Sequence, residues 1–144
     1  MCRFLLGFML VCVALRCSAA LPAEDESVPN VVERVSPNEL QSVIEGSKGR
    51  LFLLLSSNDT HCGFCIRANK RFAELATGYA AEGRFLMVQW SPWRSAFTHV
   101  LLREQEVTGL PTYFFYLDGV LSGRVDGDYP VEILASKLIE VAVL

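Results

Sequence analysis

Two cysteines three residues apart are the side chains in this sequence best suited to chemistry. They lie in the segment His61-Cys62-Gly63-Phe64-Cys65. Thiols at positions i and i+3 can form and break a disulfide reversibly, and the start of a helix lowers the pKa of a thiol and so favours the reactive thiolate. The spacing therefore predicts thiol–disulfide exchange, provided that a helix begins at the pair.

The other three of the five cysteines lie within residues 1–20, in a segment typical of an export signal. Arg3 precedes an apolar run over residues 4–15, and the small residues 18–20 suit a cleavage site. The run is shorter than the roughly 20 residues that span a bilayer as a helix. We expect residues 1–20 to be a cleaved signal peptide and the protein to be periplasmic or otherwise exported. An uncleaved anchor, or a lipid anchor at Cys17, is the alternative.

The rest of the composition suits one small globular domain. The chain has 144 residues, with 13 Lys and Arg against 16 Asp and Glu, a net charge of −3. No basic run or arginine–aromatic stripe appears, so nucleic acid is not an expected partner. Residues 21–30 are acidic and contain proline, which predicts a flexible lead-in to a domain over residues 31–144. No later apolar stretch has spanning length, so we expect no stable membrane association after signal cleavage. We also expect a monomer.

The segments that would position the cysteine pair alternate between strands and helices. Apolar runs at 51–55 and 85–88 predict buried strands, and residues 56–60 predict a polar loop that leads into His61. The spacing of apolar residues after Cys65 predicts a helix. Residues 112–125 contain two apolar runs around Asp118-Gly119, which predicts a β-hairpin.

Three further helices are expected from their start and stop signals. Ser36-Pro37-Asn38-Glu39 has the pattern of a capping box with proline at the first helical position, and Gly46 would end that helix. A second helix would run from Ser91-Pro92 to about Val107, and Pro130 would open the last one. With a short edge strand near the start of the domain, this order predicts an α/β fold with a central mixed β-sheet flanked by helices on both faces.

Taken in order, these features resemble the thioredoxin family. A strand, then Cys62-Gly63-Phe64-Cys65, then a helix follow the family's order. Gly109-Leu110-Pro111-Thr112 precedes an aromatic strand, at the position where that family places a cis-proline. Gly119 and Gly127 flank the next strand as the family's glycines do. The resemblance covers about residues 31–144 and implies a thioredoxin fold, and the expected export makes periplasmic bacterial members more similar than cytosolic thioredoxin.

The resemblance implies roles for the residues around the dithiol. Cys62, exposed at the helix start, would attack a substrate disulfide, and the more buried Cys65 would then resolve the mixed disulfide. Gly63 would admit a partner backbone, and Phe64 would contact the partner or tune the reduction potential. A cis Leu110–Pro111 bond would present the backbone of Leu110 to an extended substrate segment.

Some positions depart from the family's pattern. His61 stands where tryptophan is usual; a protonated His61 would favour the thiolate of Cys62, and a solvated histidine is the open alternative. Ser56 stands where cytosolic thioredoxin has a buried carboxylate. The proton acceptor for Cys65 therefore stays unassigned, with water, Asp59 and Glu74 as candidates.

Two tryptophans follow the second apolar run, next to a proline. Trp90 and Trp93 would belong either to the core or to a rim beside the dithiol, and we favour the rim.

The expected function is thiol–disulfide exchange with proteins, in the reducing direction. The partners would be a disulfide-bearing protein substrate and an upstream dithiol/disulfide donor protein, and no bound cofactor is required. Oxidase or isomerase activity, and a redox-inert module that holds an extended peptide, are alternatives. A CxxC can also be half of a metal site, but no second cysteine pair remains outside residues 1–20, so no metal is expected. A purely structural disulfide would close too short a loop to add much stability.

Overall fold

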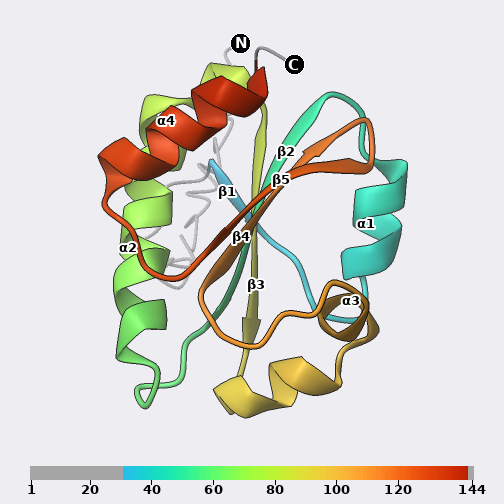
Figure 1. Cartoon of the computed structure of the whole chain (residues 1–144), viewed down its shortest axis with the longest axis vertical. Coiled ribbons are helices and arrows are strands. Elements are labelled where there is room, and N and C mark those ends of the chain that lie inside the picture. Colours follow the sequence, from blue (N-terminus) through green and yellow to red (C-terminus); the bar gives the residue numbers. More distant parts are fainter. Residues whose placement is uncertain (1–30, 143–144) are drawn as a thin grey trace, which may run out of the picture.

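The structure, a computed structural model, describes residues 31–142 (Figure 1). The predicted signal peptide and lead-in lie outside the described residues. Within the described range, no helix is long and apolar enough to cross a membrane. The elements in chain order are β1 (Val32–Arg34), α1 (Leu40–Gly46), β2 (Arg50–Ser57), α2 (Gly63–Gly78), η1 (Ala80–Glu82), β3 (Arg84–Trp90), η2 (Trp93–Thr98), α3 (Val100–Glu104), β4 (Thr112–Leu117), β5 (Val120–Asp126) and α4 (Val131–Ala142).

The five strands form one mixed sheet in the order β1-β3-β2-β4-β5. Strands β1 and β2 run parallel to β3, whereas β4 is antiparallel to both β2 and β5. The predicted central strand is confirmed, and it is longer than expected. Ser56 and Ser57 belong to β2 and are fully buried, because β2 stays paired with β3 as far as Ser57 and Trp90. The sequence pattern wrongly placed both serines in the loop.

Helices cover both faces of the sheet, as Figure 1 shows: α2 and α4 lie on one face, α1 and α3 on the other. The alternation of side chains along β2 explains the two layers. Phe52 and Leu54 belong to the core cluster that holds residues of α2 and α4. Leu51, Leu53 and Leu55 belong to the cluster that holds residues of α1 and α3. This arrangement confirms the predicted fold class. The apolar run of β2 is unbroken because both faces of the strand are covered.

The predicted capping box is wrong. Helix α1 begins at Leu40, with Glu39 as N-cap and no side-chain cap bond. The Ser36 hydroxyl instead donates to the Glu39 carboxylate at 2.7 Å, so these two side chains satisfy each other rather than the backbone. The predicted end of this helix at Gly46 is confirmed.

The helix predicted from Ser91-Pro92 to Val107 is divided into two. A 3₁₀ segment, η2, ends at Thr98, and α3 begins at Val100 and ends at Glu104. Between them His99 has an extended backbone, and its ring Nδ1 accepts from the Leu101 N–H at 3.3 Å as the cap of α3. The apolar spacing was helical on both sides of His99, but the histidine cap starts a new helix.

The predicted hairpin of β4 and β5 is confirmed. Its turn residues, Asp118 and Gly119, have φ angles of 50° and 79°. A two-residue turn with positive φ at both positions matches the twist of the strands and explains the Asp-Gly sequence. Asp118 also joins the hairpin to the start of β2, because its carboxylate accepts from the Gly49 N–H at 2.7 Å.

Candidate functional site

The Cys62–Cys65 pair is a disulfide at the amino end of α2. Cys62 is the N-cap residue and Cys65 lies in the first turn, with their Cα atoms 5.2 Å apart. The chain reaches this position through a tight turn in which the Cys62 N–H donates to the Asp59 carbonyl at 3.0 Å. The first-turn N–H groups of a helix lack partners inside the helix, so the sulfur atoms lie at its positive end.

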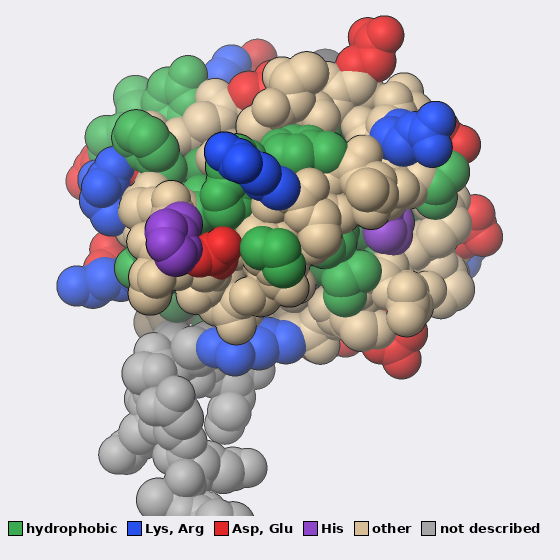
Figure 2. All heavy atoms as spheres, turned by 90° about the horizontal axis from the view of Figure 1, so that it is seen from below, with side chains coloured by type: hydrophobic (Ala, Val, Ile, Leu, Met, Phe, Trp, Pro, Cys, Tyr) green, Lys and Arg blue, Asp and Glu red, His purple; other side chains and the backbone are tan. Residues whose placement is uncertain are grey.

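Both cysteines are buried. Cys65 is completely inaccessible, as expected, but Cys62 is only 8% exposed. The prediction of an exposed Cys62 is therefore wrong in degree: this residue lies in the lining of a groove of about 340 Å³. The groove is lined by His61, Cys62, Gly63, Phe64, Arg67, Trp93, Thr108, Gly109 and Leu110. The amino end of α2 and η2 lie at the lower end of Figure 1, which Figure 2 shows from below.

Three of the predicted groove residues line this hollow and one does not. Gly63, Phe64 and Leu110 lie in the groove wall, and Phe64 is 61% exposed. Pro111 instead lines an adjacent, smaller hollow of about 210 Å³, together with residues of β5. The Leu110–Pro111 bond is cis, and the Pro111 carbonyl accepts from the Gly127 N–H at 2.9 Å. Pro111 is thereby tied to the end of β5.

The two tryptophans take different positions. Trp93 lines the groove from η2. Trp90, the last residue of β3, is 6% exposed and belongs to the core cluster, so the rim prediction is wrong for it. The end of β3 at Trp90 explains the division, because the backbone leaves the sheet between the two indoles.

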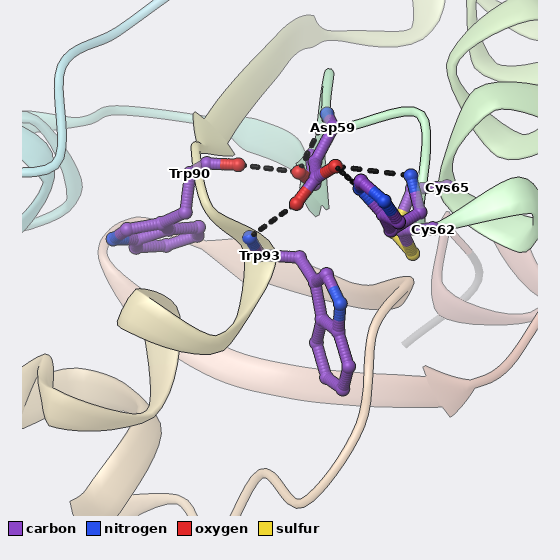
Figure 3. A network of polar contacts seen from close by, with 7 residues as sticks. Asp59, Cys62, Cys65, Trp90 and Trp93 are labelled. Atoms are coloured by element: carbon purple, nitrogen blue, oxygen red, sulfur yellow. Dashed lines mark hydrogen bonds and ion pairs between the residues drawn. A yellow bond between two sulfur atoms is a disulfide. The ribbon is translucent and has the colours of Figure 1, made fainter.

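Asp59 connects the cysteine loop to η2. One carboxylate oxygen accepts from the backbone N–H of His61 at 2.9 Å and from its ring Nδ1 at 2.8 Å, and the other accepts from the Trp93 N–H at 3.3 Å. The Asp59 N–H donates to the Ser57 hydroxyl at 2.9 Å, and that hydroxyl donates to the Trp90 carbonyl. Figure 3 shows Asp59 between Trp93 and the cysteine pair.

These contacts hold the pKa of Asp59 below its ordinary value. The largest cause is the hydrogen bond from the His61 backbone and the next is the bond from the His61 side chain, while partial burial acts in the opposite direction. Hydrogen bonds to the charged form favour that form. Both Asp59 carboxylate oxygens thus accept from donors, and these bonds join the cysteine loop to η2. An aspartate that can bond the N–H two residues ahead is a local sequence signal for this turn.

His61 lies at the groove edge with its side chain 86% exposed. Within residues 31–142 its only hydrogen-bond partner is Asp59, so its ring has no hydrogen bond to either sulfur. His61 is therefore adjacent to Cys62 in the sequence, but its ring Nδ1 points toward the Asp59 carboxylate.

A serine–amide pair lies beside Cys65, where cytosolic thioredoxin would have the carboxylate. The fully buried Ser56 hydroxyl donates to the Asn69 side-chain oxygen at 2.5 Å and lies 3.4 Å from the Cys65 carbonyl. The Asn69 amide donates to the Ser57 carbonyl at 2.9 Å. Asn69, from the second turn of α2, was not predicted from the sequence. Glu74 is exposed and lies about 13 Å further along α2 than Cys65, which removes it from the site.

Within the described residues, no group of three or more His, Cys, Asp or Glu side chains could hold a metal ion.

Comparison with solved structures identifies the fold. Mitochondrial thioredoxin 3 from Saccharomyces cerevisiae, in its oxidised form, matches with a TM-score of 0.58 and 21% identity over 76% of this chain and 94% of that one. Chloroplastic thioredoxin z matches with a TM-score of 0.61 and 16% identity over 78% of this chain and 96% of that one. No protein-family model matches the chain, and no curated protein matches it. The chain has the thioredoxin fold, with a CxxC disulfide at the start of α2.

Proposed function

We propose that the protein is a thiol–disulfide oxidoreductase that exchanges disulfides with other proteins through Cys62 and Cys65. The position of the disulfide carries the proposal: it lies at the first turn of α2 and borders a groove, in a thioredoxin fold. A disulfide that closes so short a loop adds little stability, which favours a reactive role over a structural one.

The reaction begins from the reduced protein. The Cys62 thiolate, stabilised by the unpaired N–H groups and dipole of α2, attacks one sulfur of a substrate disulfide. The substrate S–S bond breaks, a mixed disulfide forms, and the departing substrate sulfur takes a proton. Cys65 then loses its proton and attacks the Cys62 sulfur, which releases the second substrate thiol. Two electrons pass to the substrate, and the Cys62–Cys65 disulfide of the structure is the oxidised product.

The burial of the two cysteines supports this division of roles. Cys65 is completely inaccessible, so it can be reached by the neighbouring sulfur of Cys62 and not by a protein substrate. Cys62 retains partial access and borders the groove. An upstream dithiol protein would return the disulfide to the dithiol form.

The direction of electron flow and the compartment are further parts of the proposal. We propose a reductant that is exported, which the signal-like segment 1–20 supports. A reduction potential near roughly −270 mV would support a reductant, whereas one near roughly −120 mV would indicate an oxidant. Fractionation of cells that express the full-length, tagged chain tests the export.

Mixed-disulfide trapping tests the activity. We expect the wild-type protein to reduce insulin and Cys65→Ser to retain partners through Cys62, visible as adducts on non-reducing electrophoresis. Cys62→Ser is the matched control and should capture none. Absence of both insulin reduction and adducts would refute the proposal. If Cys62→Ser still binds partners and supports their function, the redox-inert peptide-binding module is the better description.

A further inference from the structure

Two aromatic side chains of the groove each carry an arginine on the face of the ring. The Arg67 guanidinium carbon lies 4.8 Å from the centre of the Phe64 ring, and that of Arg94 lies 5.1 Å from the Trp93 ring. A guanidinium stacked on a ring keeps its N–H donors at its edge, where they can bind a carboxylate. Each of these two walls of the groove thus combines an aromatic surface with a cation: Phe64 with Arg67 on α2, and Trp93 with Arg94 on η2.

Two carboxylates that contact groove residues, Asp59 and Asp128, are turned to internal partners. Asp128 has a side chain only 7% exposed and accepts from Arg67 Nε at 3.0 Å and from an Arg71 terminal nitrogen at 2.7 Å. Two arginines share this one carboxylate, and the Arg67 side chain stays 53% exposed. The Asp59 carboxylate, 13% exposed, accepts the three bonds described above. The two acids therefore present little charge to the groove.

The resulting local charge is opposite to that of the whole chain. The chain has a net charge of −3, yet no aspartate or glutamate lines the groove, whereas Arg67 does. Among residues 31–142 no carboxylate lies within ion-pair distance of the exposed Arg94. Figure 2 shows hydrophobic and basic side chains on this end of the molecule, with acidic ones mainly at its margin. Such a local field attracts anionic segments and repels cationic ones.

We propose that the groove selects protein disulfides in which the cysteine lies in an extended segment with an apolar neighbour and flanking aspartate or glutamate. This inference rests on the proposed function. The apolar neighbour would lie against Phe64, Trp93 or Leu110. The flanking carboxylates would bind the exposed edges of Arg67 and Arg94. The electron transfer is the two-electron exchange described above, with the acidic protein disulfide as the species reduced.

Three synthetic peptides test the selectivity. Each has one cysteine next to a leucine, blocked as a mixed disulfide with neutral mercaptoethanol, and the flanking residues are glutamate, glutamine or lysine. The reduced wild-type protein is mixed with each peptide, and the release of peptide thiol is followed by chromatography. We expect the second-order rate constant to be about tenfold higher for the glutamate than for the lysine peptide at low salt. The ratio of the glutamate to the lysine rate constant should fall toward one at about 0.5 M salt, because the Debye length is then only about 4 Å.

Matched variants assign the selectivity to the groove. Arg94→Gln and Arg67→Gln should each reduce the glutamate-to-lysine ratio by about threefold. Lys48→Gln makes the same charge change before β2, at the opposite end of that strand from the cysteine loop, and should leave the ratio unchanged. Arg67 also binds Asp128, so Arg67→Gln removes an internal ion pair. Arg94→Gln removes none in the part of the chain that the structure describes and should disturb the fold less.

The outcomes separate the two proposals. Equal rates for the three peptides, or a faster lysine peptide, would overturn the selectivity while leaving the oxidoreductase intact. A glutamate preference that survives both arginine substitutions would also overturn it, because the charge would then act from elsewhere. If the protein reduces neither the peptides nor insulin, the proposed function fails and the selectivity falls with it.

Discussion

The hydrogen bonds between Ser56 and Asn69 provide a quantitative test of how the floor of the site is held. Asn69 accepts from the Ser56 hydroxyl at 2.5 Å and donates to the Ser57 carbonyl at 2.9 Å, so it joins α2 to the end of β2. Asn69→Ala removes both bonds. Ser56 is completely buried, and its hydroxyl would retain only the weak 3.4 Å contact with the Cys65 carbonyl.

The magnitudes follow from these contacts. Loss of the Ser57 bond costs about 1 kcal/mol, and leaving the buried Ser56 donor nearly unsatisfied costs about 1–2 kcal/mol more, so Asn69→Ala should lower the free energy of unfolding by about 2–3 kcal/mol. Ser56→Ala removes the donor itself and leaves a partly exposed amide, which costs about 1 kcal/mol. In the double variant only the Ser57 bond adds to that cost. The double-mutant cycle should therefore give a coupling energy of about 1–2 kcal/mol.

Urea unfolding of the oxidised proteins, followed by circular dichroism, measures all four corners of the cycle. The midpoint temperature of Asn69→Ala should also fall by roughly 10 °C, given a shift of about 4 °C per kcal/mol for a domain of this size. A coupling energy below about 0.3 kcal/mol would refute the reasoning, because additivity within that range is the behaviour of residues that share no bond. The outcome would then assign the cost of Asn69→Ala to the Ser57 bond alone.

Three further predictions concern the rest of the domain. Asp59→Asn should lower the free energy of unfolding at pH 5–7. The deficit relative to wild type should vanish as pH falls below 3.8, the ordinary pKa. The reason is that the hydrogen bonds that lower the pKa of Asp59 in the folded state stabilise the fold only while the carboxylate is ionised. Burial raises the pKa of Tyr116 to about 12, so wild-type stability should fall between pH 10 and 12, and Tyr116→Phe should reduce that loss in urea titrations. Gly83→Ala should destabilise the fold by about 1–3 kcal/mol in the same assay, because a Cβ there would lie 2.5 Å from the Arg50 carbonyl.

Each of these predictions has an internal control. A deficit of Asp59→Asn that does not shrink at all as pH falls below 3.8 would show that its carboxylate charge is not the cause. An alkaline transition identical in wild type and Tyr116→Phe would assign the transition to other groups. Gly78→Ala is the control for Gly83→Ala, since a Cβ at Gly78 meets nothing within 4 Å and should cost little or improve the end of α2.

Local sequence patterns predicted the elements correctly where apolar residues are buried and where turn residues lie at turns. The apolar run 51–55 became the central strand, and Asp118-Gly119 became a turn whose positive φ angles suit those residues. The predictions failed where side-chain partners replaced the expected ones. Ser36 bonded to Glu39 instead of the backbone, and the cap formed by His99 divided the helix expected over 92–107.

For the candidate site, the sequence alone predicted the cysteine pair, the helix that begins there and the segment at Leu110–Pro111 on the other side. The cysteine pair and its helix follow from short-range spacing, whereas the role of the Leu110–Pro111 segment came from the resemblance to the thioredoxin family. Tertiary structure decided what surrounds the pair: Cys62 is nearly covered, Trp93 and not Trp90 reaches the groove, and Pro111 lies beside it.

The same division holds for charge and hydrogen bonding. Composition shows an acidic chain, but it does not show that Asp59 and Asp128 are enclosed by donors while Arg67 and Arg94 keep exposed edges on aromatic rings. The sulfur atoms that form the disulfide belong to residues only three apart, so residue types and spacing were enough to predict it. The walls of the groove come from α2, from η2 and from the segment between α3 and β4, and only folding places these segments side by side.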